Sequence, residues 1–146
     1  MAAKLYEKMN QYLANQEVNY IKLHNLHWYV KGRSFFTLHA KLEELYDQTA
    51  DIIDDVAERL LALEQAPVAN LKDALAMATV KELDSAPVPS EDVAQKLVTD
   101  TEYWIRDTQE IIELADESGD NTTADQFSDY LGEYQKLLWM LKSYLA

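Results

Sequence analysis

The spacing of hydrophobic and polar positions predicts helices along most of this 146-residue chain. Apolar residues recur every three or four positions, which is the period of an amphipathic helix. This pattern covers four long segments, about residues 4–30, 35–63, 90–118 and 122–146. A shorter amphipathic segment, NLKDALAMA, lies in the long connection after Pro67, where Asn70 is placed to cap it. No segment shows the alternation that would predict a strand.

Glycine and proline mark the boundaries of these helices. The chain has 3 Gly and 3 Pro, and five of the six lie between the periodic segments, as residues that break helices should. Ser90 offers a cap for the third long helix, and Gly119 suits the position after its end. Gly132 lies inside the fourth, where a close approach between helices could explain it. Four long helices with one long crossover predict an all-α fold, a ferritin-like four-helix bundle with a short extra helix between helices 2 and 3.

Length, composition and charge narrow the class of protein. A chain of this length suggests one domain over residues 1–146. It has no apolar run long enough for a membrane span or a signal peptide, so a cytoplasmic location is expected. The absence of Cys excludes disulfides and thiolate chemistry. The formal charge of −13 opposes binding to phosphate backbones and suits either solubility or the attraction of cations.

All three histidines lie in one stretch, residues 24–39, which reads HNLHWYVKGRSFFTLH. Histidine is the commonest metal-ligating side chain. A di-iron site inside a ferritin-like bundle needs a Glu three residues before a His on each of two helices. The residues at those positions are Ile21, His24 and Phe36. The sequence therefore argues against a site inside the bundle.

Carboxylates of the second helix offer further ligands. Glu43 follows His39 by four residues and so shares its helix face. Glu58 is related to Asp54 in the same way. The step from His39 to Asp54 returns within about 60° of the same side, but it spans ~22 Å along the helix axis. One chain therefore cannot bring these two residues to a single ion.

A two-fold dimer would remove this difficulty. If the second helix packs antiparallel against its copy, the His39 end of one chain meets the Asp54 end of the other, and two equivalent sites result. Each site would combine two histidines of one chain with two carboxylates of its partner: His27, His39, Asp54 and Glu58. Two imidazoles with carboxylates suit Fe, Mn or Zn. The alternative is that all four are ordinary core, surface and helix-face residues.

The stretch HWYVKG followed by FFTLH resembles the Dps family of mini-ferritins (DNA-binding protein from starved cells). The family pattern His-x11-His-x14-Asp-x3-Glu is matched without a gap by four residues that would be the catalytic metal ligands: His27, His39, Asp54 and Glu58. Glu43 fits a further acidic position and would be a ligand or a bridge for a second, weaker iron position. The resemblance continues through NLKDALAMATVKEL, GDNTTADQF and KLLWML, so it spans essentially the whole chain.

This resemblance implies a ferroxidase, an enzyme that oxidises metal ions, combined with iron storage. Twelve identical subunits would form a hollow shell, with a ferroxidase centre at each two-fold interface. Such a centre oxidises Fe(II), preferably with hydrogen peroxide, and the ferric product is stored inside, which protects the cell from oxidative damage. Iron (Fe2+/Fe3+) is therefore the implied metal, although zinc or manganese could occupy the same site. Carboxylates would stabilise Fe(III), while neutral imidazoles complete its coordination.

The resemblance also implies roles for residues around the centre. Trp28 would lie near it and could take up oxidising equivalents, or could be a packed interface aromatic. His24 could support or replace a ligand, or could be an ordinary surface or core histidine. Acidic residues near the start of the last helix would line an iron-entry pore, unless they only provide helix-start acidity: Asp120, Asp125 and Asp129.

The sequence argues against DNA binding, despite the family's name. DNA-binding members carry a mobile tail rich in Lys and Arg, whereas here only three residues precede Lys4, and the C-terminal MLKSYLA offers one Lys. The acidic charge adds repulsion, so a DNA-coating role is disfavoured. Two other functions stay open: a shell protein that holds structural zinc without turnover, and a bundle that serves only to bind other proteins.

Overall fold

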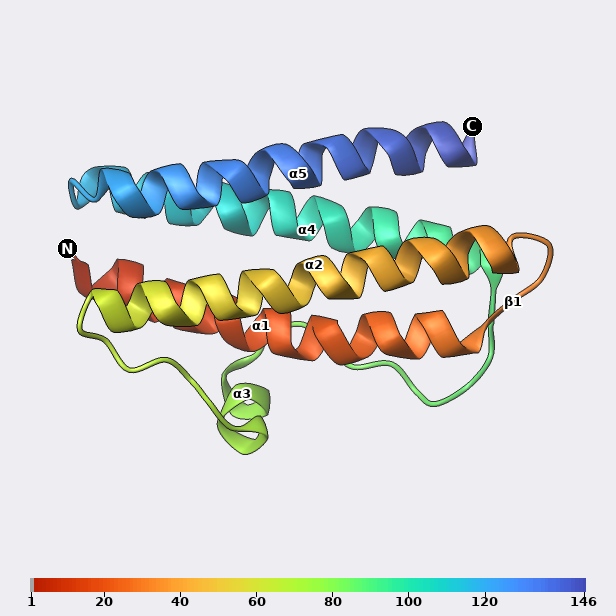
Figure 1. Ribbon diagram of the computed structural model, residues 1–146, viewed down its shortest axis with the longest axis horizontal. Coiled ribbons are helices and arrows are strands. Elements are labelled where there is room, and N and C mark those ends of the chain that lie inside the picture. The colour runs from red at the N-terminus through yellow and green to blue at the C-terminus, as the bar shows by residue number, and fades with distance from the viewer. Residues whose placement is uncertain (1) are drawn as a thin grey trace. The chain divides into compact units, whose positions relative to one another are not determined.

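The computed structural model describes residues 2–146, which are predominantly helical (Figure 1). The helices are α1 Ala2–Tyr29, α2 Phe35–Ala62, α3 Leu71–Met77, α4 Ser90–Glu117 and α5 Asn121–Leu145. Two short strands, β1 Val30–Lys31 and β2 Val88–Pro89, pair in parallel. Four long helices, with the short α3 in the crossover between the second and third of them, confirm the helical prediction. The strands correct it, because two residues are too few to show the alternation on which strand prediction depends.

The long helices follow from the period of their apolar positions, and α2 shows this most directly. Its buried residues are three or four positions apart, at Leu38, Leu42, Leu45, Thr49, Ile52, Val56 and Leu60. Such a stripe buries one side of a helix and leaves the other side to polar residues. The exposed side of α2 carries Glu43, Asp54 and Glu58.

The described residues form two compact units. One unit is Met9–Val93, which contains most of α1, all of α2 and α3, and both strands. The other is Ala94–Ala146 together with the start of the chain up to Lys8. All the candidate metal ligands therefore lie in the first unit. Among residues 2–146, no helix has both the length and the apolarity that a membrane span requires.

Asparagines of α1 hold the crossover between α2 and α4, which runs alongside α1 in Figure 1. Much of the crossover lacks regular structure, so its backbone polar groups need other partners. Asn10 Oδ1 accepts a hydrogen bond of 2.8 Å from the backbone N–H of Val68, and Asn10 Nδ2 donates one of 3.0 Å to the carbonyl of Ala66. One side chain thus satisfies a donor and an acceptor in the first part of the crossover.

Two further asparagines hold the later part of the crossover. Asn15 is fully buried, and its Oδ1 accepts hydrogen bonds from the backbone N–H groups of Thr79, at 2.7 Å, and Val80, at 3.2 Å. Asn25 Nδ2 donates to the carbonyl of Asp84 at 3.0 Å. The sequence did not lead us to expect these contacts, because they join residues more than fifty positions apart.

The predicted helix ends are partly confirmed. Asn70 is the N-cap of α3, and its Oδ1 accepts a hydrogen bond of 2.9 Å from the N–H of Asp73. Gly119 has a φ of 72° after the end of α4, the left-handed conformation that glycine adopts at little cost. Both residues therefore act at helix ends as the sequence indicated.

Two expectations about single residues are wrong. Ser90 does not cap α4: it is the first residue of the helix, and its hydroxyl donates to the carboxylate of Glu91 at 3.4 Å. No close approach within the described chain explains Gly132, since a Cβ added there would meet no atom within 4 Å. Neither outcome could be read from residue type, because both depend on what surrounds the residue.

An ion pair joins the start of α1 to α4 within the second unit. Lys8 Nζ lies 2.6 Å from Asp107 Oδ1 and 3.2 Å from Glu110 Oε2. Asp107 is 5% exposed, and its other carboxylate oxygen is buried without a hydrogen-bond partner. Burial raises the pKa of Asp107, while the hydrogen bond from Lys8 opposes the rise. The carboxylate of Asp107 therefore depends on Lys8 for its charge compensation.

Candidate metal centre

The turn between α1 and α2 brings two of the three histidines together. His27 lies in the last turn of α1, and His39 lies near the start of α2. Their rings stack with centroids 3.7 Å apart and planes 13° apart. His27 is 6% exposed, and His39 is half-buried. The structure therefore pairs the two imidazoles that the sequence nominates as ligands.

Reciprocal hydrogen bonds fix the tautomer of both rings. His27 Nδ1 lies 2.7 Å from the carbonyl oxygen of His39, and His39 Nδ1 lies 2.8 Å from the carbonyl oxygen of His27. Since a carbonyl oxygen can only accept, each Nδ1 must carry the hydrogen and donate it. In the neutral imidazole the lone pair then resides on Nε2. A backbone bond of this kind orients a metal-ligating histidine, so Nε2 is the atom through which each ring could bind a cation.

Aromatic side chains pack against both imidazoles. The ring of Phe35 stacks on His39 with centroids 4.9 Å apart. The ring of Tyr46 meets His27 edge to face at 5.3 Å. Tyr46 was not a candidate from sequence, although it lies two helical turns after His39 and therefore on the same face of α2. That spacing could have identified it.

His24 and Trp28 continue the aromatic cluster away from His27. His24 stacks on Tyr46 with centroids 3.7 Å apart, and Trp28 lies 5.1 Å from His24 with its ring tilted. Trp28 is 66% exposed. His24 Nδ1 is buried without a hydrogen-bond partner, and burial, followed by the neighbouring His27, lowers the pKa of His24. The lowered pKa favours the neutral form of His24. Its ring contacts place it between Tyr46 and Trp28.

The carboxylates do not reach the histidines within one chain. Asp54 and Glu58 are exposed on α2, as is Glu43, one turn after His39. Across residues 2–146, no group of three or more His, Asp or Glu side chains is close enough to hold a metal ion. Among the candidate ligands of residues 2–146, the structure therefore brings together the two imidazoles.

The three acidic residues at the start of α5 differ in their surroundings. Asp120 is the N-cap of α5: one carboxylate oxygen accepts from the N–H of Thr123 at 3.0 Å, and the other accepts from the hydroxyl of Thr123 at 2.6 Å. Asp125 and Asp129 are exposed, four residues apart on one face of α5. The carboxylate of Asp120 therefore stabilises the helix end, whatever else it does.

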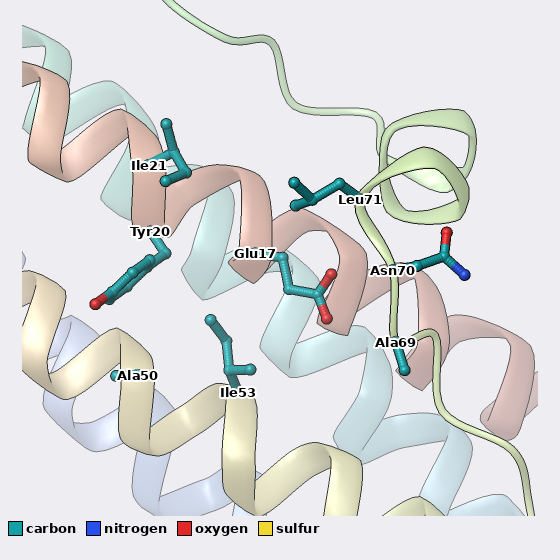
Figure 2. A pocket seen from close by; sticks show the side chains of 8 residues that line it. All are labelled: Glu17, Tyr20, Ile21, Ala50, Ile53, Ala69, Asn70 and Leu71. Carbon is teal, nitrogen blue, oxygen red and sulfur yellow. The ribbon is translucent and has the colours of Figure 1, made fainter.

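An open apolar pocket lies beside α2 in the same unit (Figure 2). Its volume is about 440 Å³. It is lined by α1, α2 and the segment that leads into α3: Glu17, Tyr20, Ile21, Ala50, Ile53, Ala69, Asn70 and Leu71. Ile21 is 51% exposed and Leu71 is 72% exposed, and burial raises the pKa of Glu17. Clustered exposed apolar side chains of this kind commonly mark a surface that another chain covers.

Comparison with protein-family models places a ferritin-like domain over residues 6–146. General stress protein 20U of Bacillus subtilis is 46% identical over 146 residues, which are 100% of both chains. DNA protection during starvation protein 2 of Bacillus anthracis is 37% identical over 145 residues, 99% of each chain.

Solved structures agree with these relatives. Dps from Staphylococcus aureus is 39% identical with a TM-score of 0.92, over 97% of this chain and 95% of that one. A Dps protein from Vibrio cholerae O1, described as a member of a broad superfamily of ferritin-like diiron-carboxylate proteins, is 37% identical with a TM-score of 0.92, over 99% of this chain and 90% of that one. The ferritin-like fold expected from the sequence is confirmed.

Proposed function

Because this chain belongs to the Dps family of ferritin-like proteins, we propose that it is an iron-storing ferroxidase. It oxidises Fe(II), preferably with hydrogen peroxide, and stores the ferric product inside a hollow shell of twelve subunits. The observation that carries this proposal is the histidine pair, in which both Nδ1 atoms donate to carbonyl oxygens and both Nε2 atoms are left to bind metal. Iron as the substrate is supported by the Vibrio cholerae relative, which is described as a member of a superfamily of ferritin-like diiron-carboxylate proteins.

The ferroxidase centre forms between two subunits. His27 and His39 come from one chain, and Asp54 and Glu58 of the partner subunit complete the ligand set. This division follows from the ~22 Å between His39 and Asp54 along α2, and from the lack of any three-ligand cluster in residues 2–146. Glu43 binds or bridges a second, weaker iron position.

The apolar pocket supports a two-fold interface on this face of α2. Asp54 lies four residues after Ala50, which lines the pocket, so the two residues share a face of the helix. Covering Ile21 and Leu71 with a second copy of the chain would remove apolar surface from water. The same contact would carry Asp54 of each chain toward the histidines of the other, and an isologous dimer repeats it twice.

The chemistry is the transfer of two electrons to one peroxide. Two Fe(II) ions each give up one electron, the O–O bond of hydrogen peroxide breaks, and two protons complete two water molecules. No hydroxyl radical is released because both electrons arrive at the same peroxide. Carboxylates favour the ferric product, and the neutral imidazoles hold the ions without adding charge.

The aromatic cluster has a protective role in this proposal. Tyr46, His24 and Trp28 form a line of ring contacts from His27 to an exposed side chain. If only one Fe(II) is present, a single electron must come from elsewhere, and an indole or phenol ring can supply it. Trp28 and His24 thus support electron transfer.

Iron enters by a separate route, through acidic pores at the three-fold axes of the shell. The exposed carboxylates of Asp125 and Asp129 line this route and attract cations. Asp120, the N-cap of α5, lies at the start of the same helix.

The first test is oxidation with size analysis. Purified protein receives Fe(II) without oxygen and then hydrogen peroxide, while ferric absorbance and size-exclusion elution are followed. We expect rapid oxidation, with iron eluting in a large shell. The His27→Ala/His39→Ala variant should lose rapid oxidation. Oxidation no faster than in buffer, or iron outside a small protein peak, would instead support a structural zinc site or an interaction module.

Mixed subunits test the position of the centre. One chain carries His27→Ala/His39→Ala and the other carries Asp54→Asn/Glu58→Gln. If ligands come from two chains, half of randomly formed dimers are mixed and each has one intact site, so coexpression should restore about a quarter of wild-type activity. Ligands confined to one chain would give no recovery. Asp55→Asn is the matched control, since this neighbour of Asp54 is also exposed.

A further inference from the structure

The geometry of the histidine pair depends on the turn that joins α1 to α2. Each ring is held by the backbone of the other histidine, at 2.7 and 2.8 Å. A small displacement of one helix end against the other would lengthen both hydrogen bonds. Whatever fixes residues 30–34 therefore also fixes the direction of the two Nε2 atoms.

Two independent observations favour glycine at position 32 of this turn. Its φ is 117°, a left-handed conformation that side chains with a Cβ rarely adopt. A Cβ at this position would also lie 2.9 Å from Ser90 Oγ, and Ser90 is 4% exposed at the start of α4. The carbonyl of Gly32 accepts a hydrogen bond of 3.1 Å from the N–H of Phe35, the first residue of α2.

The pairing of the two strands also restrains this turn. Val30 and Lys31 follow α1 directly and pair with Val88 and Pro89 of the crossover. Val30 is 3% exposed, so its pairing is shielded from water. We call the β1–β2 pair, together with the Ser90 side chain that occupies the space beside Gly32, the turn clamp.

We propose that the turn clamp positions the two metal-binding histidines, and that Gly32 and Ser90 are positioning residues for the centre. The crossover thereby controls ligand geometry without providing a ligand. Its end is itself anchored to α1, since Asn25 donates to the carbonyl of Asp84 four residues before β2. The metal-binding consequence rests on the proposed function, whereas the effect on the histidine hydrogen bonds does not.

The test compares two glycines. Gly32→Ala is the variant, and Gly119→Ala is the matched control, because Gly119 also has a positive φ, of 72°, but no atom lies within 4 Å of an added Cβ. Co(II), which peroxide-free buffer leaves unoxidised, is titrated into the full-length protein and followed by its visible absorption. We expect Gly32→Ala to bind Co(II) about tenfold more weakly, with shifted bands, a size typical of lost ligand orientation. Gly119→Ala should match wild type.

A metal-free measurement separates the two proposals. The imidazole Nδ1–H protons give slowly exchanging downfield NMR signals when carbonyl oxygens hold them, and His27→Ala/His39→Ala identifies those signals by their absence. We expect Gly32→Ala to lose them and Gly119→Ala to keep them. Signals and Co(II) spectrum unchanged in Gly32→Ala would overturn the positioning role, even if thermal stability falls. If wild type binds no Co(II) but the signals behave as expected, the proposed function fails and the clamp stands.

If Gly32→Ala does not fold, Ser90→Thr is the alternative variant for both measurements. This substitution adds a methyl group to the buried Ser90 side chain beside Gly32, keeps the hydroxyl and leaves Gly32 unchanged. We expect a smaller change in the same direction in both measurements, and wild-type behaviour would count against the clamp.

Discussion

At the scale of single residues, two side-chain pairs show different uses of polar groups: the stacked histidines and a buried ion pair. His27 and His39 each donate Nδ1–H to a backbone carbonyl oxygen, and in the proposed centre Nε2 of each ring binds the cation. Lys8 and Asp107 instead neutralise each other in a buried place. Breaking a buried ion pair leaves one charge without compensation, which costs far more than a surface pair is worth.

Lys8→Met should therefore destabilise the protein by about 3–5 kcal/mol at neutral pH. Burial already raises the pKa of Asp107, and the variant removes the hydrogen bond that opposes this rise. The folded chain then binds a proton more tightly than the unfolded chain, so stability is regained as pH falls toward the usual carboxyl range. Lys8 itself stays charged in wild type, because burial lowers its pKa less than the two carboxylates raise it.

Urea unfolding at pH 7 and pH 5 measures this effect. The loss caused by Lys8→Met, relative to wild type, should be smaller at pH 5. For Lys8→Met/Asp107→Asn, the loss of unfolding free energy relative to wild type should be similar at the two pH values, since the titrating group is gone. An equal loss at both pH values for Lys8→Met alone would contradict the assignment to Asp107.

Residue spacing was enough to nominate His27 and His39, but not to orient them. Their pairing depends on a turn that reverses the chain, and their tautomers depend on two carbonyl oxygens that no sequence pattern specifies. Tyr46 could have been found from its two-turn spacing to His39. The link between Gly32 and Ser90 could not, because the two residues are far apart in the chain.

At the scale of elements, the start of α5 combines two roles for acidic residues. Asp120 uses its carboxylate to satisfy the N–H and the hydroxyl of Thr123. Asp125 and Asp129 stay exposed one turn apart. A helix end can thus be stabilised by one carboxylate while the next two remain open to cations.

Asp125→Asn/Asp129→Asn should slow iron entry several-fold and leave assembly intact, because the attraction of cations to the pore is reduced. Stopped-flow ferric absorbance measures uptake, and size exclusion measures assembly. Glu91→Gln/Asp92→Asn makes the same change in charge at the exposed start of α4 and should keep wild-type uptake. Equal uptake by both double variants would exclude the pore.

The long helices could be predicted because their apolar period repeats over many turns, as the buried stripe of α2 shows. The cap Asn70 could also be predicted, since it acts on its own helix. The strands and the asparagine contacts of Asn10, Asn15 and Asn25 could not, because each is a single contact between distant segments. Local regularity was visible in the sequence, and tertiary pairing was not.

At the scale of the whole molecule, the net charge bears on which partners the protein can bind. Each chain carries a formal charge of −13. A shell of twelve would carry −156, twelve times that value. Fe(II) is attracted to such a shell, whereas a phosphate backbone is repelled.

We therefore expect no DNA binding at neutral pH, although relatives carry the name DNA protection during starvation protein. A gel-shift assay at about 100 mM salt should leave DNA unretarded. The same protein with an added lysine-rich tail is the positive control. Retardation by the unmodified protein would show that local basic contacts overcome the net charge.

The asparagine contacts of α1 also bear on the order in which the chain is made. Asn10, Asn15 and Asn25 all precede the crossover that they hold, so each partner is already present when the crossover leaves the ribosome. The unit Met9–Val93 is continuous in sequence. Both partners of each of these hydrogen bonds, and of those in the histidine pair, are therefore synthesised before residues 94–146.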